Sequence, residues 1–346
     1  MTETEDALAK NLDDREELLE DNSKNNKKKF IISFVVILMI FIIILLILIF
    51  TVFKKDNESE TKYEGDTELD TISSEELNKA RKSFKQLNYT DEKDSTKILS
   101  YNLFIPENYT KEEQYPLMLF ISDKSLVGKE LTAPLTETVG GPIWATDTVQ
   151  KKHKCFVLVP QYEEGIISSS GNKSIYVNIT INLISNLTRE YSIDQNRIYG
   201  TGQSMGAMTT LFLLANKNLF AAGLIADGHW LIEELYGLVN ATFTFCAAEG
   251  DPNPFNSQNE VKQYFDSINV TYGSLDLINA RENIDLLNDK AKKMYELGYK
   301  QNFISYAKGT VFPPGSEQKS EHMASFKYAY RIETVRDWIF DQVKGK

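Results

Sequence analysis

Apolar residues are distributed very unevenly along this chain. The first 29 residues are polar and mixed in charge, and the next 24, residues 30–53, carry no charge and are nearly all Ile, Leu, Val or Phe. As a helix, this segment would be about 36 Å long, compared with about 30 Å for the hydrocarbon core of a bilayer. The pattern predicts a disordered tail over residues 1–29 and one transmembrane helix, an anchor over residues 30–53.

The charges on either side of this segment predict its orientation. Four lysines lie between positions 24 and 29, whereas Lys54 and Lys55 are followed at once by acidic residues. The positive-inside rule therefore predicts a single-pass protein of the cell membrane, with a cytoplasmic amino terminus and its main domain outside the cytoplasm. The lipid bilayer is its predicted partner there. The polar run 54–79 is interpreted as a stalk, and residues 80–346 as the folded domain.

Beyond the stalk, short runs rich in β-branched and aromatic residues alternate with stretches of helical periodicity. Strands are predicted at 83–89, 98–105, 117–121, 155–159, 197–200, 221–226, 243–247 and 303–306. Helices are predicted at 142–152, 174–191, 204–215, 258–268, 283–297 and 325–343, and an additional strand at 270–275. The alternation predicts an α/β fold with a mainly parallel, eight-stranded sheet covered by helices on both faces and with an antiparallel edge at its start.

A serine flanked by two glycines follows the strand predicted at 197–200. Gly202-Gln203-Ser204-Met205-Gly206 is a G-x-S-x-G pattern, and a helical run comes directly after it. In a strand-turn-helix context this pattern lifts a serine hydroxyl above the edge of the sheet, and glycines are needed because the bend is so sharp. The sequence therefore predicts Ser204 as a nucleophile.

A serine hydroxyl needs a base, and the chain has three histidines. His153 precedes a strand, at the wrong end of the sheet, and is interpreted as a solvated loop residue. His229 follows a strand and is interpreted as a pocket-wall or core residue. His322 lies between the last strand and the last helix, where the chain order Ser, acid, His places the base.

The acid that orients the imidazole is expected after the strand predicted at 243–247. Asp251, in Glu249-Gly250-Asp251-Pro252, is the preferred candidate, although an Asp before Pro is also common in simple turns. Glu249 lies two residues away and Asp227 follows the preceding strand, so either could serve as the alternative acid.

Stabilising the tetrahedral intermediate requires two hydrogen-bond donors. One is expected from the backbone N–H of Met205, and the second from the loop Ser122-Asp123-Lys124-Ser125, where Asp123 and Lys124 are the candidates. The carboxylate of Asp123 would oppose an oxyanion, so this side chain is expected to turn away and brace the loop.

The net charge, the cysteines and the histidines argue against several kinds of partner and cofactor. A net charge of -11 leaves no basic field for a phosphate backbone, so no nucleic-acid partner is expected. Cys155 and Cys246 lie in apolar strand-like runs and are interpreted as small core residues and not as a disulfide. Three scattered histidines form no ligand cluster, so neither a metal nor an organic cofactor is expected.

Several stretches between residues 95 and 342 resemble the bacterial α/β-hydrolases known as carboxylesterases, polyhydroxybutyrate-depolymerase-like esterases or predicted peptidases. The matching stretches are Tyr101-Asn102-Leu103-Phe104-Ile105-Pro106, Tyr115-Pro116-Leu117, the run 156–162, the run 197–206, Glu249-Gly250-Asp251-Pro252, and His322 with Arg336-Asp337-Trp338. The resemblance implies an α/β-hydrolase fold, a triad of Ser204, Asp251 and His322, and an oxyanion donor from the loop 122–125.

These features predict a membrane-anchored serine hydrolase, carboxylesterase-like, that cleaves a small ester or acyl substrate through an acyl-enzyme. A serine peptidase or an acyltransferase could use the same triad. An anchored recognition or adhesion module without turnover is the non-enzymatic alternative, because the loop 122–125 lacks the HisGly pair common at this place.

Overall fold

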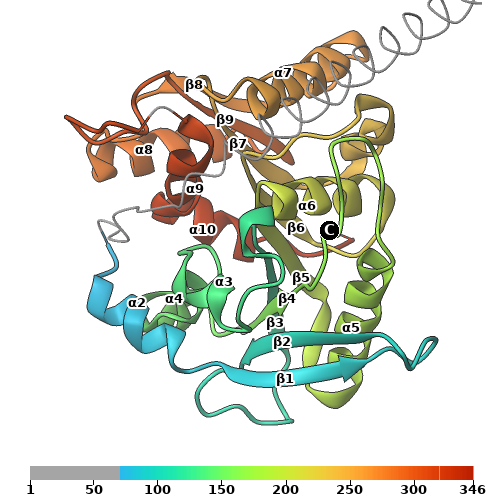
Figure 1. Cartoon of the computed structure of the whole chain (residues 1–346). Helices are drawn as coiled ribbons and strands as arrows, with labels where there is room; N and C mark the ends of the chain where they lie inside the picture. The colour runs from blue at the N-terminus through green and yellow to red at the C-terminus, as the bar shows by residue number, and fades with distance from the viewer. Residues whose placement is uncertain (1–70, 319, 346) are drawn as a thin grey trace, which may run out of the picture. The chain divides into compact units, whose positions relative to one another are not determined.

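Nine strands form one sheet in the part of the chain that the structure, a computed structural model, describes: residues 71–318 and 320–345 (Figure 1). The strands are β1 (Lys85–Thr90), β2 (Ile98–Phe104), β3 (Tyr115–Ile121), β4 (Phe156–Gln161), β5 (Ile193–Gln203), β6 (Ala222–Ala226), β7 (Phe243–Ala248), β8 (Gly273–Ile278) and β9 (Gln301–Tyr306). Their order across the sheet is β1-β2-β4-β3-β5-β6-β7-β9-β8. The pairs β1–β2 and β2–β4 are antiparallel and the others are parallel, so the predicted antiparallel edge is confirmed.

The predicted number of eight strands is wrong by one. The ninth is β8, the edge strand next to β9, which lies in the region where an additional strand was expected at 270–275. Four of its six residues are exposed or partly exposed, and its pairing is irregular between Leu275 and Ile278. An edge strand of this kind lacks the continuous apolar run that marks a central parallel strand.

Helices cover both faces of the sheet, as predicted (Figure 1). They are α2 (Ser74–Arg81), α3 (Ala133–Thr136), α4 (Asp147–Lys152), α5 (Tyr176–Glu190), α6 (Met205–Asn216), α7 (Pro252–Ser267), α8 (Ile284–Tyr295), α9 (Glu321–Arg331) and α10 (Glu333–Phe340). Short 3-10 turns are η1 (Lys124–Leu126), η2 (Pro142–Ala145), η3 (Ile232–Glu234) and η4 (Tyr236–Asn240).

Two apolar clusters form the core, one on each face of the sheet. Strand β3 shows the alternation: Leu117 and Leu119 belong to the cluster that contains α5, α6 and α7, whereas Met118 and Phe120 belong to the cluster that contains α2, α4, α8, α9 and α10. All seven residues of β3 are buried, as expected of a strand covered on both faces.

Two helical segments differ from the sequence prediction. Helix α2 begins at Ser74, within the range 54–79 that was interpreted as stalk, and Leu77 packs into the core. This end of the stalk therefore belongs to the folded domain. The single helix predicted at 325–343 is divided into α9 and α10 at Ile332, whose backbone is extended.

The predicted tail and anchor at 1–29 and 30–53, and the stalk up to residue 70, lie outside the described residues. Within residues 71–318 and 320–345, no helix combines the length and the apolar character needed to cross a bilayer.

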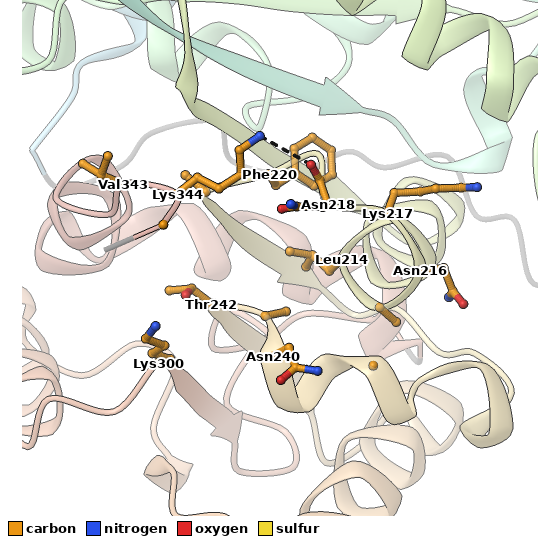
Figure 2. Close-up of a pocket in the computed structure, with 15 residues that line it drawn as sticks. Leu214, Asn216, Lys217, Asn218, Phe220, Asn240, Thr242, Lys300, Val343 and Lys344 are labelled. Atoms are coloured by element: carbon orange, nitrogen blue, oxygen red, sulfur yellow. Dashed lines mark hydrogen bonds between the residues drawn. The ribbon is translucent and has the colours of Figure 1, made fainter.

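A pocket of about 730 Å³ opens at the amino ends of β6, β7 and β9 (Figure 2). Ala221, Thr242 and Lys300, each of which directly precedes one of these strands, contribute to its wall together with the end of α6 and residues 343–345. Figure 2 shows Lys344 Nζ reaching over to the carbonyl oxygen of Asn218, at 3.4 Å. The predicted nucleophile and acid follow parallel strands, so they lie at the carboxyl ends of the strands, whereas this pocket lies at the amino ends.

Candidate active site

Ser204 occupies the sharp turn between β5 and α6. Its backbone has φ +50° and ψ −117°, a conformation that is costly for any residue with a side chain, and its N–H donates to the carbonyl of Ala226 at 3.1 Å. The turn also presses against the end of β3: a methyl group at Gly206 would lie 1.8 Å from the carbonyl oxygen of Ile121. The glycine at this position is therefore required by the close approach of two backbones.

The structure brings the three predicted catalytic side chains together. His322 lies in the first turn of α9 and Asp251 directly precedes α7, so both follow strands of the sheet (Figure 1). The Nε2 atom of His322 lies 2.8 Å from Ser204 Oγ, and its Nδ1 atom lies 2.5 Å from Asp251 Oδ2. Serine, imidazole and carboxylate thus form one continuous hydrogen-bonded chain, the arrangement that lets an imidazole take a proton from a hydroxyl.

The surroundings of His322 favour its protonated form. Burial lowers the pKa of His322, but the hydrogen bond to Asp251 and the negative charges of Asp251, Asp227 and Asp123 outweigh this and raise the pKa above its ordinary value. Phe326, one turn further along α9, packs against the imidazole edge to face with ring centroids 4.9 Å apart. This contact and the carboxylate fix the orientation of the ring.

The two alternative acids have other partners. Glu249 Oε2 accepts a hydrogen bond from the backbone N–H of Lys308 at 2.8 Å, so Glu249 braces the loop between β9 and α9. Asp227 is fully buried, and its Oδ1 accepts the N–H of Ala248 at 2.8 Å. Neither carboxylate is hydrogen-bonded to a nitrogen of His322, whereas Asp251 Oδ2 is.

The loop after β3 is held by Asp123. Its Oδ1 accepts hydrogen bonds from the N–H and the hydroxyl of Ser125, and its Oδ2 accepts one from Gln203 Nε2 at 2.7 Å. Asp123 is buried, so this carboxylate braces the loop against the residue that precedes the nucleophile. Lys124, by contrast, is exposed.

The buried carboxylate of Glu321, the residue that directly precedes His322, was missed in the sequence analysis. Glu321 Oε2 accepts the N–H of Gly250 at 2.9 Å, and its Oε1 accepts the N–H of Gly309 at 2.5 Å. Glu321 therefore ties the start of α9, which carries His322, to the loop that carries Asp251. A glutamate before a histidine gives no signal in the sequence, because the role depends on burial and on two distant glycines.

The other histidines and the cysteines have separate surroundings. His153 is half-buried, pairs with Asp337 at 2.8 Å and stacks on Phe340, so its interpretation as a solvated loop residue is wrong. His229 is partly buried and lies 3.0 Å from Ser169 Oγ. Both cysteines are buried and free, as predicted. Among the described residues, no group of three or more His, Cys, Asp or Glu side chains could hold a metal ion.

Comparisons with known proteins identify the fold. No family model and no curated protein matches the chain. Among solved structures, a thermostable esterase matches with a TM-score of 0.59 and 23% identity, over 76% of this chain and 64% of that one. This chain thus spans less than two thirds of that esterase. A mutant feruloyl esterase module from Clostridium thermocellum, complexed with sinapinate, matches with a TM-score of 0.52 and 14% identity, over 83% of this chain and 99% of that one.

The protein is thus an α/β protein in which the side chains of Ser204, Asp251 and His322 meet at the carboxyl ends of the parallel strands of a mainly parallel sheet. Its fold is the α/β-hydrolase fold, as the resemblance implied.

Proposed function

We propose that this protein is a serine hydrolase that cleaves a carboxylic ester through an acyl-enzyme. The observation that carries the proposal is the hydrogen-bonded chain from Ser204 through His322 to Asp251, with distances of 2.8 and 2.5 Å. The esterases with the same fold support an ester as substrate, but their identity to this chain is too low to specify the acyl group or the alcohol.

In the proposed mechanism, His322 Nε2 takes the proton of the Ser204 hydroxyl while Oγ attacks the ester carbonyl. The imidazolium, held by Asp251, then gives this proton to the departing alcohol, and the acyl group stays on Oγ. Water attacks the acyl-enzyme next. His322 removes a proton from that water and returns one to Oγ, which releases the carboxylic acid and restores the enzyme.

Two backbone N–H groups are proposed to hold the oxyanion. Met205 is the first residue of α6 and Lys124 the first of η1, and N–H groups at such positions have no acceptor within their own helix. The contact between Gly206 and the end of β3 brings these two starting turns together. In this proposal the carboxylate of Asp123 does not oppose the oxyanion, because its hydrogen bonds are made with Ser125 and Gln203.

The proposal is tested on the full chain, in detergent, by labelling with a fluorophosphonate and by hydrolysis of a p-nitrophenyl ester. Ser204→Ala should abolish labelling and lower turnover by on the order of 10³-fold or more, because alanine has no hydroxyl oxygen that could carry the acyl group. Ser267→Ala, at an exposed serine of α7 whose hydroxyl donates to the carbonyl of Tyr264, is the matched control and should behave as wild type. Equal labelling of the wild type and Ser204→Ala would refute the proposal.

The same assay separates the related activities. Faster cleavage of a peptide p-nitroanilide than of any p-nitrophenyl ester would replace the esterase by a peptidase. Product formed only when an alcohol acceptor is added would indicate an acyltransferase. A wild-type chain that is folded but neither labelled nor active would favour a recognition module without turnover.

A further inference from the structure

Asp227 is a buried acidic residue that the proposed mechanism does not use. It follows β6, is fully buried, and has a backbone φ of +49°, in the left-handed region. Its N–H donates to the carbonyl of Cys246 at 2.9 Å. A non-glycine residue in this conformation is strained, and a buried carboxylate adds a desolvation cost, so a compensating role is expected.

Residues 226 and 227 connect to all three elements of the triad. The carbonyl of Ala226 accepts the N–H of Ser204 at 3.1 Å. The carboxylate of Asp227 accepts the N–H of Ala248, whose own carbonyl accepts the N–H of Asp251 at 3.0 Å.

The third connection runs through Ser325, which lies in α9 one turn after the base. Its hydroxyl donates its hydrogen to the carbonyl of His322 at 2.7 Å, and the Asp227 carboxylate, whose pKa this hydroxyl lowers, is the alternative acceptor for the same hydrogen. When the hydrogen is on the His322 carbonyl, Oδ2 of Asp227 has no hydrogen-bond partner among the described residues. Asp227 is thus connected to the segments that carry the three predicted catalytic side chains, while one of its carboxylate oxygens has no hydrogen-bond partner among the described residues.

The groups that face Asp227 explain its charge state. They are Asp251 in the acid loop, His322 in α9, Cys246 in β7 and Tyr306 in β9. Burial and the negative charge of Asp251 raise the pKa of Asp227 well above its ordinary value, although the hydroxyl of Ser325, the hydrogen bond from Ala248 and the charge of His322 act in the other direction. The negative charge of Asp227 in turn helps to raise the pKa of the His322 imidazole, so a change in that charge also acts on the imidazole.

We propose that Asp227 is a positioning residue of the catalytic site: together with the Ala226 carbonyl it links the elements that carry Ser204, Asp251 and His322, and its charge acts on the imidazole. The proposal rests on the proposed function. When Asp227 is ionised it favours the protonated imidazole, and when it is neutral this contribution disappears. The pH at which His322 becomes neutral, and so able to accept the Ser204 proton, therefore depends on Asp227, to which His322 is not hydrogen-bonded.

The test is the pH dependence of kcat/KM for a p-nitrophenyl ester, measured on the full chain from about pH 5 to about pH 9. Asp227→Asn keeps the shape of the side chain and imitates the neutral carboxyl at every pH. The acid limb of the profile should move to lower pH, by on the order of one unit, because His322 loses a negative neighbour. A limb that stays at the wild-type position would overturn the proposal.

A second variant covers the possibility that Asp227→Asn fails to fold. Ser325→Ala removes the hydroxyl that lowers the pKa of Asp227. Asp227 then stays neutral to higher pH, so the acid limb should move in the same direction by a smaller amount. A purely structural role would lower kcat without moving the limb.

The matched control is Asp194→Asn, which removes a partly buried aspartate that pairs with Arg197 near the start of β5. Its acid limb should match that of the wild type. Failure of the proposed function is seen separately: a wild-type chain without Ser204-dependent hydrolysis refutes the hydrolase itself. An active wild type whose acid limb is unaffected by Asp227→Asn and Ser325→Ala refutes only the role of Asp227.

Discussion

At the scale of single residues, His322 determines how the proposed activity depends on pH. Its imidazole must be neutral to accept the Ser204 proton, and its pKa is raised above the ordinary value of 6.5 because Asp251 and its acidic neighbours outweigh the effect of burial. The protonated form therefore persists to higher pH than in a free histidine. We expect kcat/KM to fall on acidification with a midpoint above pH 6.5, and a profile measured with a p-nitrophenyl ester checks this.

Replacing Asp251 tests whether its carboxylate is what raises the pKa of His322. Asp251→Asn removes the hydrogen-bonded carboxylate, so the midpoint should fall toward or below the ordinary value while turnover drops by on the order of 10⁴-fold. Glu249→Asn serves for comparison, because its carboxylate bonds to the N–H of Lys308 and not to the imidazole. A wild-type midpoint below pH 6.5 would contradict the electrostatic argument.

The residues that could be predicted from the sequence are those whose chemistry has a local pattern. Ser204 stands in a five-residue motif, and Asp251 and His322 are found by their chain order after strands. Glu321 and the Asp227–Ser325 pair could not be predicted, because their roles depend on contacts between segments far apart in the sequence. Motifs identify groups that react, whereas the groups that position them are identified only by burial and hydrogen bonds.

At the scale of elements, the junction between β5, α6 and the end of β3 is the most constrained part of the fold. A methyl group at Gly206 would also lie 2.9 Å from the carbonyl oxygen of Ser122, so Gly206→Ala must push the nucleophile turn away from the loop that begins there. We expect this variant either to lose several degrees in Tm and all fluorophosphonate labelling, or not to fold. Thermal unfolding and labelling measure both effects.

Gly165→Ala is the matched control for this prediction. Apart from its two chain neighbours, no heavy atom of the described residues lies within 4 Å of the position that its methyl group would take, so its Tm and labelling should match those of the wild type. Normal labelling of Gly206→Ala would show that the loop after β3 yields easily and that the turn is not held by this contact.

The elements that the sequence predicted well are the buried ones. Strands β3, β4 and β7 are buried along their whole length and appear as continuous apolar runs. Helix α2 was missed because six of its eight residues are exposed or partly exposed, and only Leu77 and Ala80 reach the core. The edge strand β8 was left out of the strand count for a similar reason: most of its residues are not buried.

At the scale of the whole molecule, the proposed membrane attachment depends on residues 30–53. In the described part of the chain the apolar faces of the helices pack into the two core clusters, and no helix there could span a bilayer. Deleting residues 38–47 leaves 14 of the 24 residues in the uncharged run. As a helix these would be about 21 Å long, too short for a hydrocarbon core of about 30 Å.

The full chain should therefore stay with the membrane fraction through an alkaline carbonate wash, whereas the deletion variant should be released. Replacing residues 38–47 by ten leucines keeps the length and apolar character of the segment and should restore retention, which separates the effect of length from that of the particular sequence. Both variants keep the described residues 71–318 and 320–345, in which Ser204, His322 and Asp251 are hydrogen-bonded in a chain, so Ser204-dependent hydrolysis should persist in each. Release of the wild type by the wash, or retention of the deletion variant, would show that something other than the length of this segment determines where the protein resides.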